Sequence, residues 1–285
     1  MPHSDAALLR QLSSNSTPYR DPLALIEWDK LNLDDPWLPE AALSLYGLPE
    51  FATLSDTVKL RLSQYEFINV MLAGLWLEGL FLRRFAHRLG PSLERSEREY
   101  LLHEMREEAG HSLMFLKAIE ASGLALPDDA WRAPRFASLL SDNLPLDGAL
   151  FWLAAVIGED VPDKFNRFVR QSAQQVNPAV RQILSIHIID EARHIALARG
   201  RLETRLRECR SLQRAALACL ARLLLRQLVD VFCFPPARFY ELAGLTRGQS
   251  WRHLARKSQV RREFVAQCLA PTRRMLGGYG LDVGF

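Results

Sequence analysis

The sequence predicts an all-α protein, and three observations support this. Hydrophobic residues recur with helical spacing over long stretches, no run alternates with the period of a strand, and several stretches end at Gly or Pro. The chain has 285 residues and is 48% hydrophobic, which is enough to bury the core of one large domain. We therefore expect a single helical domain over residues 1–285.

Two long helices are predicted in the first half of the chain. Apolar periodicity runs over residues 56–88 and stops at Gly90-Pro91, and a second periodic stretch runs over 94–122 as far as Gly123. The Pro-containing segment 124–143 is expected to cross the molecule as a connection. Before the long helices, we expect a mobile N-terminus over about residues 1–20 and short helices over 23–31 and 39–46.

Two further long helices are predicted in the second half. One begins near Pro145 and is interrupted by Pro162, and the other has Asn177 as its N-cap and Pro178 as its first residue. The last long helix continues to about residue 209, so the four together predict a four-helix bundle over about 56–209. The remaining elements flank it: helices over 212–232, 237–243 and 249–268, and an extended Gly-rich tail over 277–285.

Composition excludes several classes of protein. The 36 Lys and Arg residues nearly balance 33 Asp and Glu, so nothing favours binding to nucleic acid or a membrane. The four cysteines form no Cys-x-x-Cys pair, which argues against a zinc knuckle and a secreted disulfide scaffold. No signal-peptide pattern and no apolar run of about 18 residues is present. We expect a cytoplasmic protein.

Two carboxylates fall on helix faces that are otherwise apolar. Glu78 shares a face with Met71 and Leu82, and Glu159 shares one with Trp152. Each of these acids alone could be an ordinary core group with a satisfied side chain. Because burial of an unpaired carboxylate is costly, each needs a cation, a proton or a hydrogen-bonding partner.

The other two long helices each carry a Glu-x-x-His pair. Glu108 with His111 and Glu191 with His194 place a carboxylate and an imidazole on one helical face. Each pair follows one of the lone glutamates by about 30 residues, so lone Glu and Glu-x-x-His alternate along the chain. This pattern is typical of a dinuclear carboxylate site in a four-helix bundle. The four carboxylates would balance the charge of two divalent metal ions.

The string Asp190-Glu191-Ala192-Arg193-His194 resembles the ferritin-like di-iron superfamily. Its members include ribonucleotide reductase small subunits, acyl-carrier desaturases and bacterial multicomponent monooxygenases. The resemblance implies that Asp190 accepts a hydrogen bond from a ligating histidine, His111, and that Glu107 does the same for His194. Arg193 is expected to pair with acids across the bundle.

A third histidine narrows the resemblance to one family. His187 lies four residues before Glu191 and seven before His194, which places all three on one helical face. This His-x-x-x-Glu-x-x-His run resembles the p-aminobenzoate N-oxygenase (AurF-like) family, whose members bind two irons through four Glu and three His. The resemblance implies these ligands and no further catalytic residue: Glu78, Glu108, His111, Glu159, His187, Glu191 and His194.

The resemblance also implies a function. It indicates a non-haem di-iron N-oxygenase that uses dioxygen and an external electron donor to oxidise a small amine in secondary-metabolite biosynthesis. The amine is an arylamine or is derived from an amino acid, the product is a hydroxylamine, nitroso or nitro compound or an N-oxide, and the protein is expected to be a homodimer.

Two alternatives stay open: a di-iron hydroxylase or desaturase that acts at carbon, and a non-catalytic iron-binding bundle. Phe115 occupies the position of the radical-forming tyrosine of reductase small subunits, which disfavours radical generation. The role of Glu104 is also open, because it either faces the site or forms a salt bridge.

Overall fold

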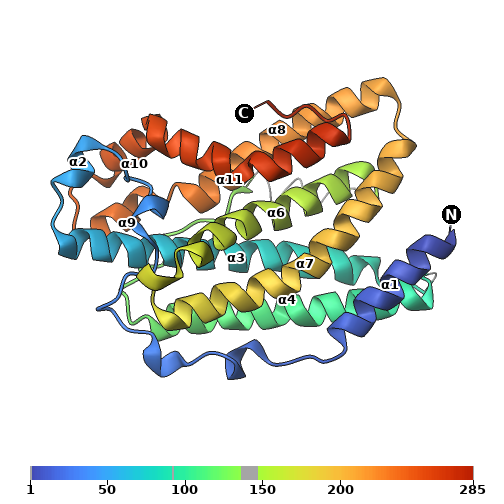
Figure 1. Ribbon diagram of the computed structural model, residues 1–285, viewed down its shortest axis with the longest axis horizontal. Coiled ribbons are helices and arrows are strands. Elements are labelled where there is room, and N and C mark those ends of the chain that lie inside the picture. The colour runs from blue at the N-terminus through green and yellow to red at the C-terminus, as the bar shows by residue number, and fades with distance from the viewer. Residues whose placement is uncertain (1, 92, 136–146, 285) are drawn as a thin grey trace.

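Four long helices form a bundle in the computed structural model, which describes residues 2–91, 93–135 and 147–284 (Figure 1). Within these ranges the chain has no strand. The helices α3 and α4 pack side by side, as do α6 and α7, and α4 also contacts α7. Their bounds are α3 (Asp56–Arg88), α4 (Arg95–Ala121), α6 (Ala149–Gln171) and α7 (Pro178–Arg207).

Capping side chains explain where two of these helices begin. The Ser55 side chain accepts a hydrogen bond from the backbone N–H of Val58 at the start of α3. The Asn177 side chain accepts from the N–H groups of Ala179 and Val180 at the start of α7, where Pro178 takes the first helical position. Both caps satisfy N–H groups that have no partner within the helix. The predicted start of α7 is therefore confirmed.

The structure corrects the expectation that Pro162 interrupts the third helix. Pro162 lies inside α6, which continues as an α-helix to Gln171. A proline in a helix interior costs about 3 kcal/mol, because it removes a hydrogen bond and crowds the preceding turn. α6 packs against α7, α8 (Ser211–Cys233) and α11 (Gln259–Gly278), and this burial holds the helix together across the proline. The predicted start near residue 145 lies outside the described residues.

The N-terminal segment also differs from expectation. We expected residues 1–20 to be mobile, but Pro2–Ser16 form the helix α1, which packs against α4 and α7. The reason is a short apolar face, since Leu9 and Leu12 lie one turn apart and are both buried.

The prediction of short helices over 23–31 and 39–46 is wrong, because these segments contain only short 3-10 turns. The Asn32 side chain accepts hydrogen bonds from the N–H groups of Asp34 and Asp35, which favours a turn over a helix. The elements of this region are η1 (Pro22–Ala24), η2 (Trp28–Lys30), η3 (Glu40–Ala42) and the short helix α2 (Pro49–Ala52).

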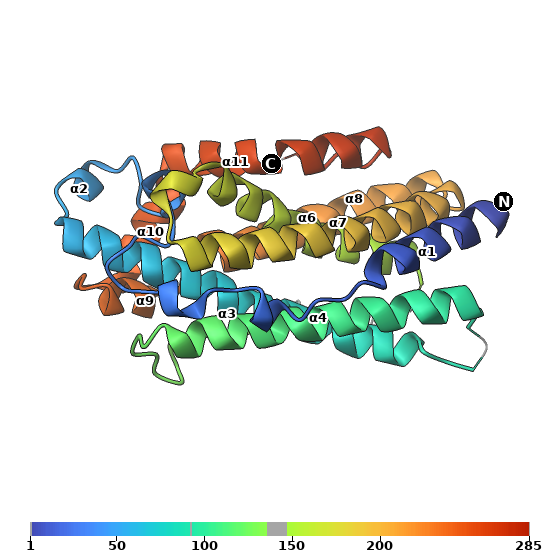
Figure 2. The same cartoon turned by 60° about the horizontal axis from the view of Figure 1, so that its bottom comes forward.

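Two of the C-terminal helices, α8 and α11, pack against α6, and Figure 2 shows α11 on the outside of the bundle. The single helix predicted over 249–268 is two helices, α10 (Gly248–Lys257) and α11. They separate at Ser258, whose side chain caps α11 by accepting from the N–H of Arg261. α11 continues to Gly278, so the first part of the predicted extended tail is helical. A shorter helix, α9 (Ala237–Leu242), packs against α3 and α10.

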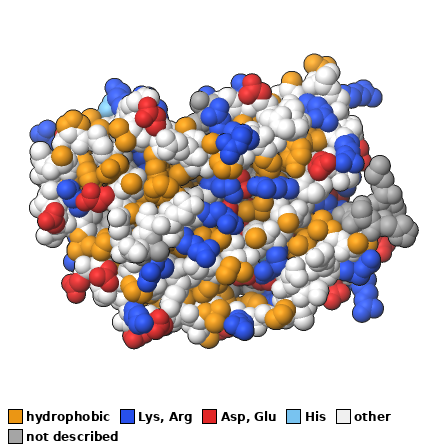
Figure 3. Space-filling model, in the orientation of Figure 1, with side chains coloured by type: hydrophobic (Ala, Val, Ile, Leu, Met, Phe, Trp, Pro, Cys, Tyr) orange, Lys and Arg blue, Asp and Glu red, His pale blue; other side chains and the backbone are white. Residues whose placement is uncertain are grey.

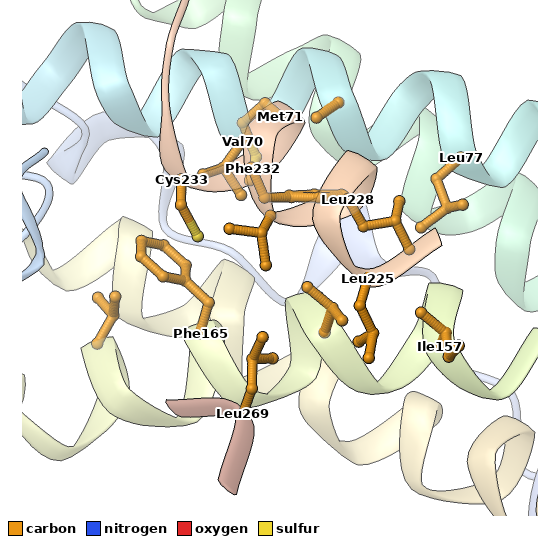
Figure 4. Packing of buried hydrophobic residues seen from close by; sticks show 14 of the residues in the cluster. Val70, Met71, Leu77, Ile157, Phe165, Leu225, Leu228, Phe232, Cys233 and Leu269 are labelled. Atoms are coloured by element: carbon orange, nitrogen blue, oxygen red, sulfur yellow. The ribbon is translucent and has the colours of Figure 1, made fainter. Parts of the chain in front are cut away.

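An apolar layer between α3, α6 and α8 forms part of the core (Figure 4). Met71 of α3, Phe165 of α6 and Phe232 of α8 all point into it. α3 is apolar and long enough to cross a membrane by length and composition, but 72% of its most apolar window is buried inside the protein. Its composition is therefore accounted for by the bundle core.

Charged side chains cover the outer surface. Figure 3 shows Lys and Arg spread among hydrophobic and acidic side chains over one face of the molecule. The acids predicted as metal ligands are buried in the bundle interior. The surface of the protein is for this reason more basic than the net charge of +3 suggests.

Candidate metal centre

The structure brings all seven predicted ligands together in the middle of the bundle. Glu78 comes from α3, Glu159 from α6, and the two Glu-x-x-His pairs from α4 and α7. Every one of the seven residues is at most 4% exposed. Their donor atoms, together with those of Glu104, form three groups, of which two share Glu191 and two share His194.

The first group contains Glu78, His111, His187 and Glu191, whose donor atoms lie within 4.8 Å of one another. The Nε2 atom of His187 is 3.3 Å from Oε1 of Glu78 and 3.3 Å from Oε1 of Glu191. The Nδ1 atom of His111 is 3.4 Å from the same oxygen of Glu191. Two imidazoles and two carboxylates thus converge on one position.

The other two groups share His194: one contains Glu159 and Glu191, and the other contains Glu104 and Glu108. The Nδ1 atom of His194 is 3.1 Å from Oε1 of Glu108 and 3.5 Å from Oε2 of Glu191. Since Oε2 of Glu108 approaches His111 at 3.5 Å, both Glu108 and Glu191 direct one oxygen to each position. These two carboxylates have the geometry of bridging ligands.

Unsatisfied polar atoms show that this centre fits cations. Both carboxylate oxygens of Glu108 and Glu191, and the Nδ1 atoms of His111 and His194, are buried without a hydrogen-bond partner. Burial and the negative charge of Glu108 raise the pKa of Glu78 well above its usual range, and burial with Glu191 does the same for Glu159. Two divalent ions would satisfy these atoms and remove the repulsion.

The family model for p-aminobenzoate N-oxygenase AurF matches residues 3–280 of the chain. The protein belongs to the AurF family. Among curated relatives, the uncharacterized proteins Rv0885 of Mycobacterium tuberculosis (strain H37Rv) and Mb0909 of Mycobacterium bovis (strain ATCC BAA-935 / AF2122/97) are each 27% identical over 277 residues. The alignments cover 94% of this chain and 79% of each relative.

Solved structures of an R2-like ligand-binding oxidase share the fold. The oxidase with aerobically reconstituted Mn/Fe cofactor superposes with a TM-score of 0.59 at 17% identity, covering 96% of this chain and 92% of the other. A variant of this oxidase with one substitution gives the same TM-score and identity, and the superposition covers 95% of this chain and 93% of the other. The predicted all-α, ferritin-like bundle with flanking helices is thereby confirmed. Family and fold together support an oxygenase of the dinuclear metal class.

Two carboxylates outside the centre of this AurF-family protein orient its histidines. Asp190 Oδ2 lies 3.2 Å from Nε2 of His111, and Glu107 Oε2 lies 3.0 Å from Nε2 of His194. An acceptor at Nε2 keeps the proton there and leaves the Nδ1 lone pair for a metal. Burial alone would lower the pKa of each histidine. Hydrogen bonds to Asp190 and Glu108 instead raise the pKa of His111 well above its usual range. The negative charges of Glu108 and Glu191 do the same for His194.

Arg193 joins these two carboxylates. Its Nη2 atom donates to Oδ1 of Asp190 at 2.5 Å and contacts Oε1 of Glu107 at 2.8 Å. The predicted pairing of Arg193 with acids across the bundle is therefore present, through Glu107 of α4. Asp190 adds a partner on its own helix. One guanidinium thus orients the acceptors of a histidine at each metal position.

Asn166 is a site residue that the sequence reasoning missed. It is 4% exposed on α6, and its Nδ2 atom lies 3.2 Å from Nδ1 of His187. If His187 binds metal through Nε2, its proton lies on Nδ1. Rotation of the Asn166 side-chain amide by half a turn places the carbonyl oxygen there to accept a hydrogen bond from this N–H. Burial lowers the pKa of His187 to about 4, so its ring is neutral. Asn166 follows Glu159 by seven residues, or two helical turns, so the sequence already indicated that both lie on the same face of α6.

Glu104, whose role the sequence left open, faces the centre. It is 3% exposed, forms no ion pair within the described part of the chain, and groups with Glu108 and His194. Burial raises the pKa of Glu104 to about 8. Attraction to His194 opposes this shift, and the smaller repulsions from Glu108, Glu191 and Glu107 add to it. The salt-bridge alternative is therefore wrong.

A small cavity borders the first metal position. It has a volume of about 10 Å³, and Glu78, His187 and Glu159 form its polar wall. The apolar wall includes Phe115, whose ring lies against Gly74 of α3, where a Cβ atom would come within 2.7 Å. The volume admits about one water-sized molecule.

Proposed function

We propose that this protein is a non-haem di-iron N-oxygenase. It would use dioxygen to oxidise a small amine, either an arylamine or an amino-acid-derived amine, in secondary-metabolite biosynthesis. The products would be a hydroxylamine, a nitroso or nitro compound, or an N-oxide. The observation that carries the proposal is the position of His187, which adds a second imidazole to the first metal position of an AurF-family chain.

The ligand sets suit two iron ions. Glu78, His111 and His187 would hold one ion, Glu159 and His194 the other, and Glu108 with Glu191 would bridge them. A mixed set of imidazole and carboxylate donors is typical of protein-bound iron. When bound, the two ions supply the redox chemistry with dioxygen, while the protein supplies geometry and access.

The residues around the cavity act on the substrate and on water. Val70, Met71 and Phe232 make the wall beside His187 apolar, so an amine there is favoured in its neutral form with a free nitrogen lone pair. The cavity as it stands has room for a molecule the size of dioxygen, and an amine requires these side chains to move. The apolar wall also excludes water from the reacting groups.

Single-turnover oxidation of an amine panel tests the proposal. The iron-loaded protein is reduced chemically, exposed to dioxygen and read by mass spectrometry. Oxygen added to nitrogen is the expected result, and His187→Ala is expected to lose it while the control His103→Ala, a partly exposed histidine of α4, keeps it. Oxygen added at carbon would instead support a hydroxylase, and intact iron without product would support a non-catalytic bundle.

The remaining expectations belong to the same proposal. Turnover needs an external electron donor, because the centre must be reduced again after each reaction with dioxygen. We also propose a homodimer in the cytoplasm that binds neither nucleic acid nor a membrane. Leu102, Leu113 and Leu116 support the dimer, since they are 44–53% exposed along α4. Light scattering coupled to size-exclusion chromatography would report the oligomeric state.

A further inference from the structure

The two ligand-bearing helices share a spacing that extends one turn beyond the Glu-x-x-His pairs. On α7, His187 stands four residues before Glu191. On α4, Glu104 stands four residues before Glu108. Residues four apart lie on one helical face, so each helix presents three potential ligands in a row to the centre.

The two extra residues lie at different metal positions. His187 approaches Glu78, which belongs to the first position. The donor atoms of Glu104 lie within 4.8 Å of those of Glu108 and His194, which belong to the second. Each extra residue therefore groups with a histidine of the opposite helix, as a local twofold relation between α4 and α7 requires.

Among the residues that the structure describes, Glu104 has no other partner that explains its burial. Its Oε2 atom is buried without a hydrogen bond, and the side chain is 3% exposed. The hydroxyl group of Tyr100, one turn earlier, is buried and unpartnered too. A buried carboxylate that lacks a basic partner is stabilised by a proton or by a metal ion, and the donor atoms of Glu108 and His194 nearby favour a metal ion.

We infer that Glu104 is an additional metal ligand, which binds the ion at the second position and is the counterpart of His187 at the first. This inference rests on the dinuclear centre of the proposed function. It makes the two positions chemically unlike, because the first then has two imidazoles and the second has one imidazole and an extra carboxylate. Carboxylates suit Mn²⁺ and imidazoles suit iron, so the second position is expected to accept Mn²⁺ more readily.

Anaerobic titration of the metal-free protein with Fe²⁺, and separately with Mn²⁺, tests the role of Glu104. Wild type is expected to bind two ions, and Glu104→Gln to bind the second at least about tenfold more weakly while it keeps the first. The loss is expected to be larger for Mn²⁺. The matched control is Glu99→Gln on the exposed side of α4, which leaves both affinities unchanged.

A second variant tests the twofold relation directly. Glu104→His repeats on α4 the His-x-x-x-Glu-x-x-His spacing of α7, and it is expected to keep the second Fe²⁺ ion but to lose preference for Mn²⁺. Circular dichroism shows whether each variant is folded before metal is added. If Glu104→Gln is unfolded, it is replaced by His187→Gln, which removes a ligand of the first position in the same way. In that case, loss of the first ion with retention of the second supports the assignment of the two positions.

The outcomes separate this inference from the proposed function. Glu104→Gln that binds the second ion within about threefold of wild type overturns it, because a neutral carboxylic acid is well replaced by an amide. Wild type that binds fewer than about one ion per chain overturns the metal centre and the inference together. Wild type that binds two ions without oxidising any amine contradicts the proposed reaction and leaves the assignment of Glu104 standing.

Discussion

The inner and outer faces of α6 carry neighbouring acids with opposite environments. Glu159 and Asp160 are adjacent and 3% and 0% exposed. On the outer face, Asp160 Oδ1 accepts from Lys164 at 3.0 Å and from Arg199 at 2.6 Å, and Oδ2 accepts from Thr272 of α11. On the inner face, Glu159 lies among Glu191 and His194.

This difference shows that burial alone does not identify a metal ligand. A buried acid among cationic donors is neutralised by the protein itself, whereas acids that face one another and unsatisfied imidazoles need an ion from solution. Glu66 of α3 is a third case, because its hydrogen-bond donors are neutral and burial raises its pKa to about 7. It accepts from the N–H and the hydroxyl of Ser44, and the nearby Arg261 is itself bound to backbone carbonyls.

The largest expected effect is the loss of both metal ions when a bridging carboxylate is removed. Glu191 directs one oxygen to each position, so Glu191→Ala is expected to abolish stable occupancy of both, and Glu108→Ala is expected to do the same. Metal analysis after anaerobic reconstitution checks this. Full retention of either ion in a folded variant would contradict the bridging role.

The control lies on the other face of α6. Asp160→Asn is expected to keep both ions but to lower the free energy of unfolding by about 1–3 kcal/mol, because Lys164 and Arg199 lose a charged acceptor. Thermal unfolding and metal analysis of the same sample separate the two effects. A loss of metal in Asp160→Asn would break the distinction between the two faces.

A smaller effect is expected from pH. In the metal-free protein the folded-state pKa values of Glu78, Glu159, His111 and His194 are raised, whereas burial lowers that of His187 to about 4. The four raised groups outweigh His187, so the folded chain holds more protons than the unfolded chain between about pH 5 and 8. Stability of the metal-free protein should therefore fall as pH rises from about 5 to 8. Metal displaces these protons, so the stabilisation by bound metal should grow over the same range. Melting temperatures that rise with pH without metal would contradict this.

The smallest effect is expected at Arg193. Arg193→Gln removes the charge that holds Asp190 and Glu107, and it is expected to weaken metal binding about tenfold without removing either ion. Arg167→Gln is the matched control, because Arg167 pairs with Asp163 on the outer face of α6. Equal affinities in Arg193→Gln and wild type would mean that the histidines are oriented by the carboxylates alone.

Much of this centre was predictable from spacing within single helices. The bounds of α3, the start of α7 and the alternation of lone Glu with Glu-x-x-His follow from periodicity, capping residues and spacing, which are local features. The resemblance to the AurF-like family added His187 to the ligand set. The resemblance to the di-iron superfamily also implied the partners of both ring Nε2 atoms, Asp190 and Glu107, which occupy matching positions in the two motifs.

Other features depend on segments that are distant in the sequence. α1 and the continuity of α6 through Pro162 come from packing against neighbouring helices, which outweighs local preference. Asn166 meets His187 only because α6 lies beside α7.

The sequence by itself determined a helical bundle with acids and histidines on its inner faces, because a helix converts spacing into a shared face. Only the tertiary structure decided what each of these acids is for. Glu159 and Asp160 are adjacent acids in the sequence. In the structure, Asp160 accepts hydrogen bonds from Thr272 and Arg199. Glu159 instead lies beside Glu191 and His194. The electrostatic role of a buried carboxylate is set by the charges packed around it, and those come from other helices.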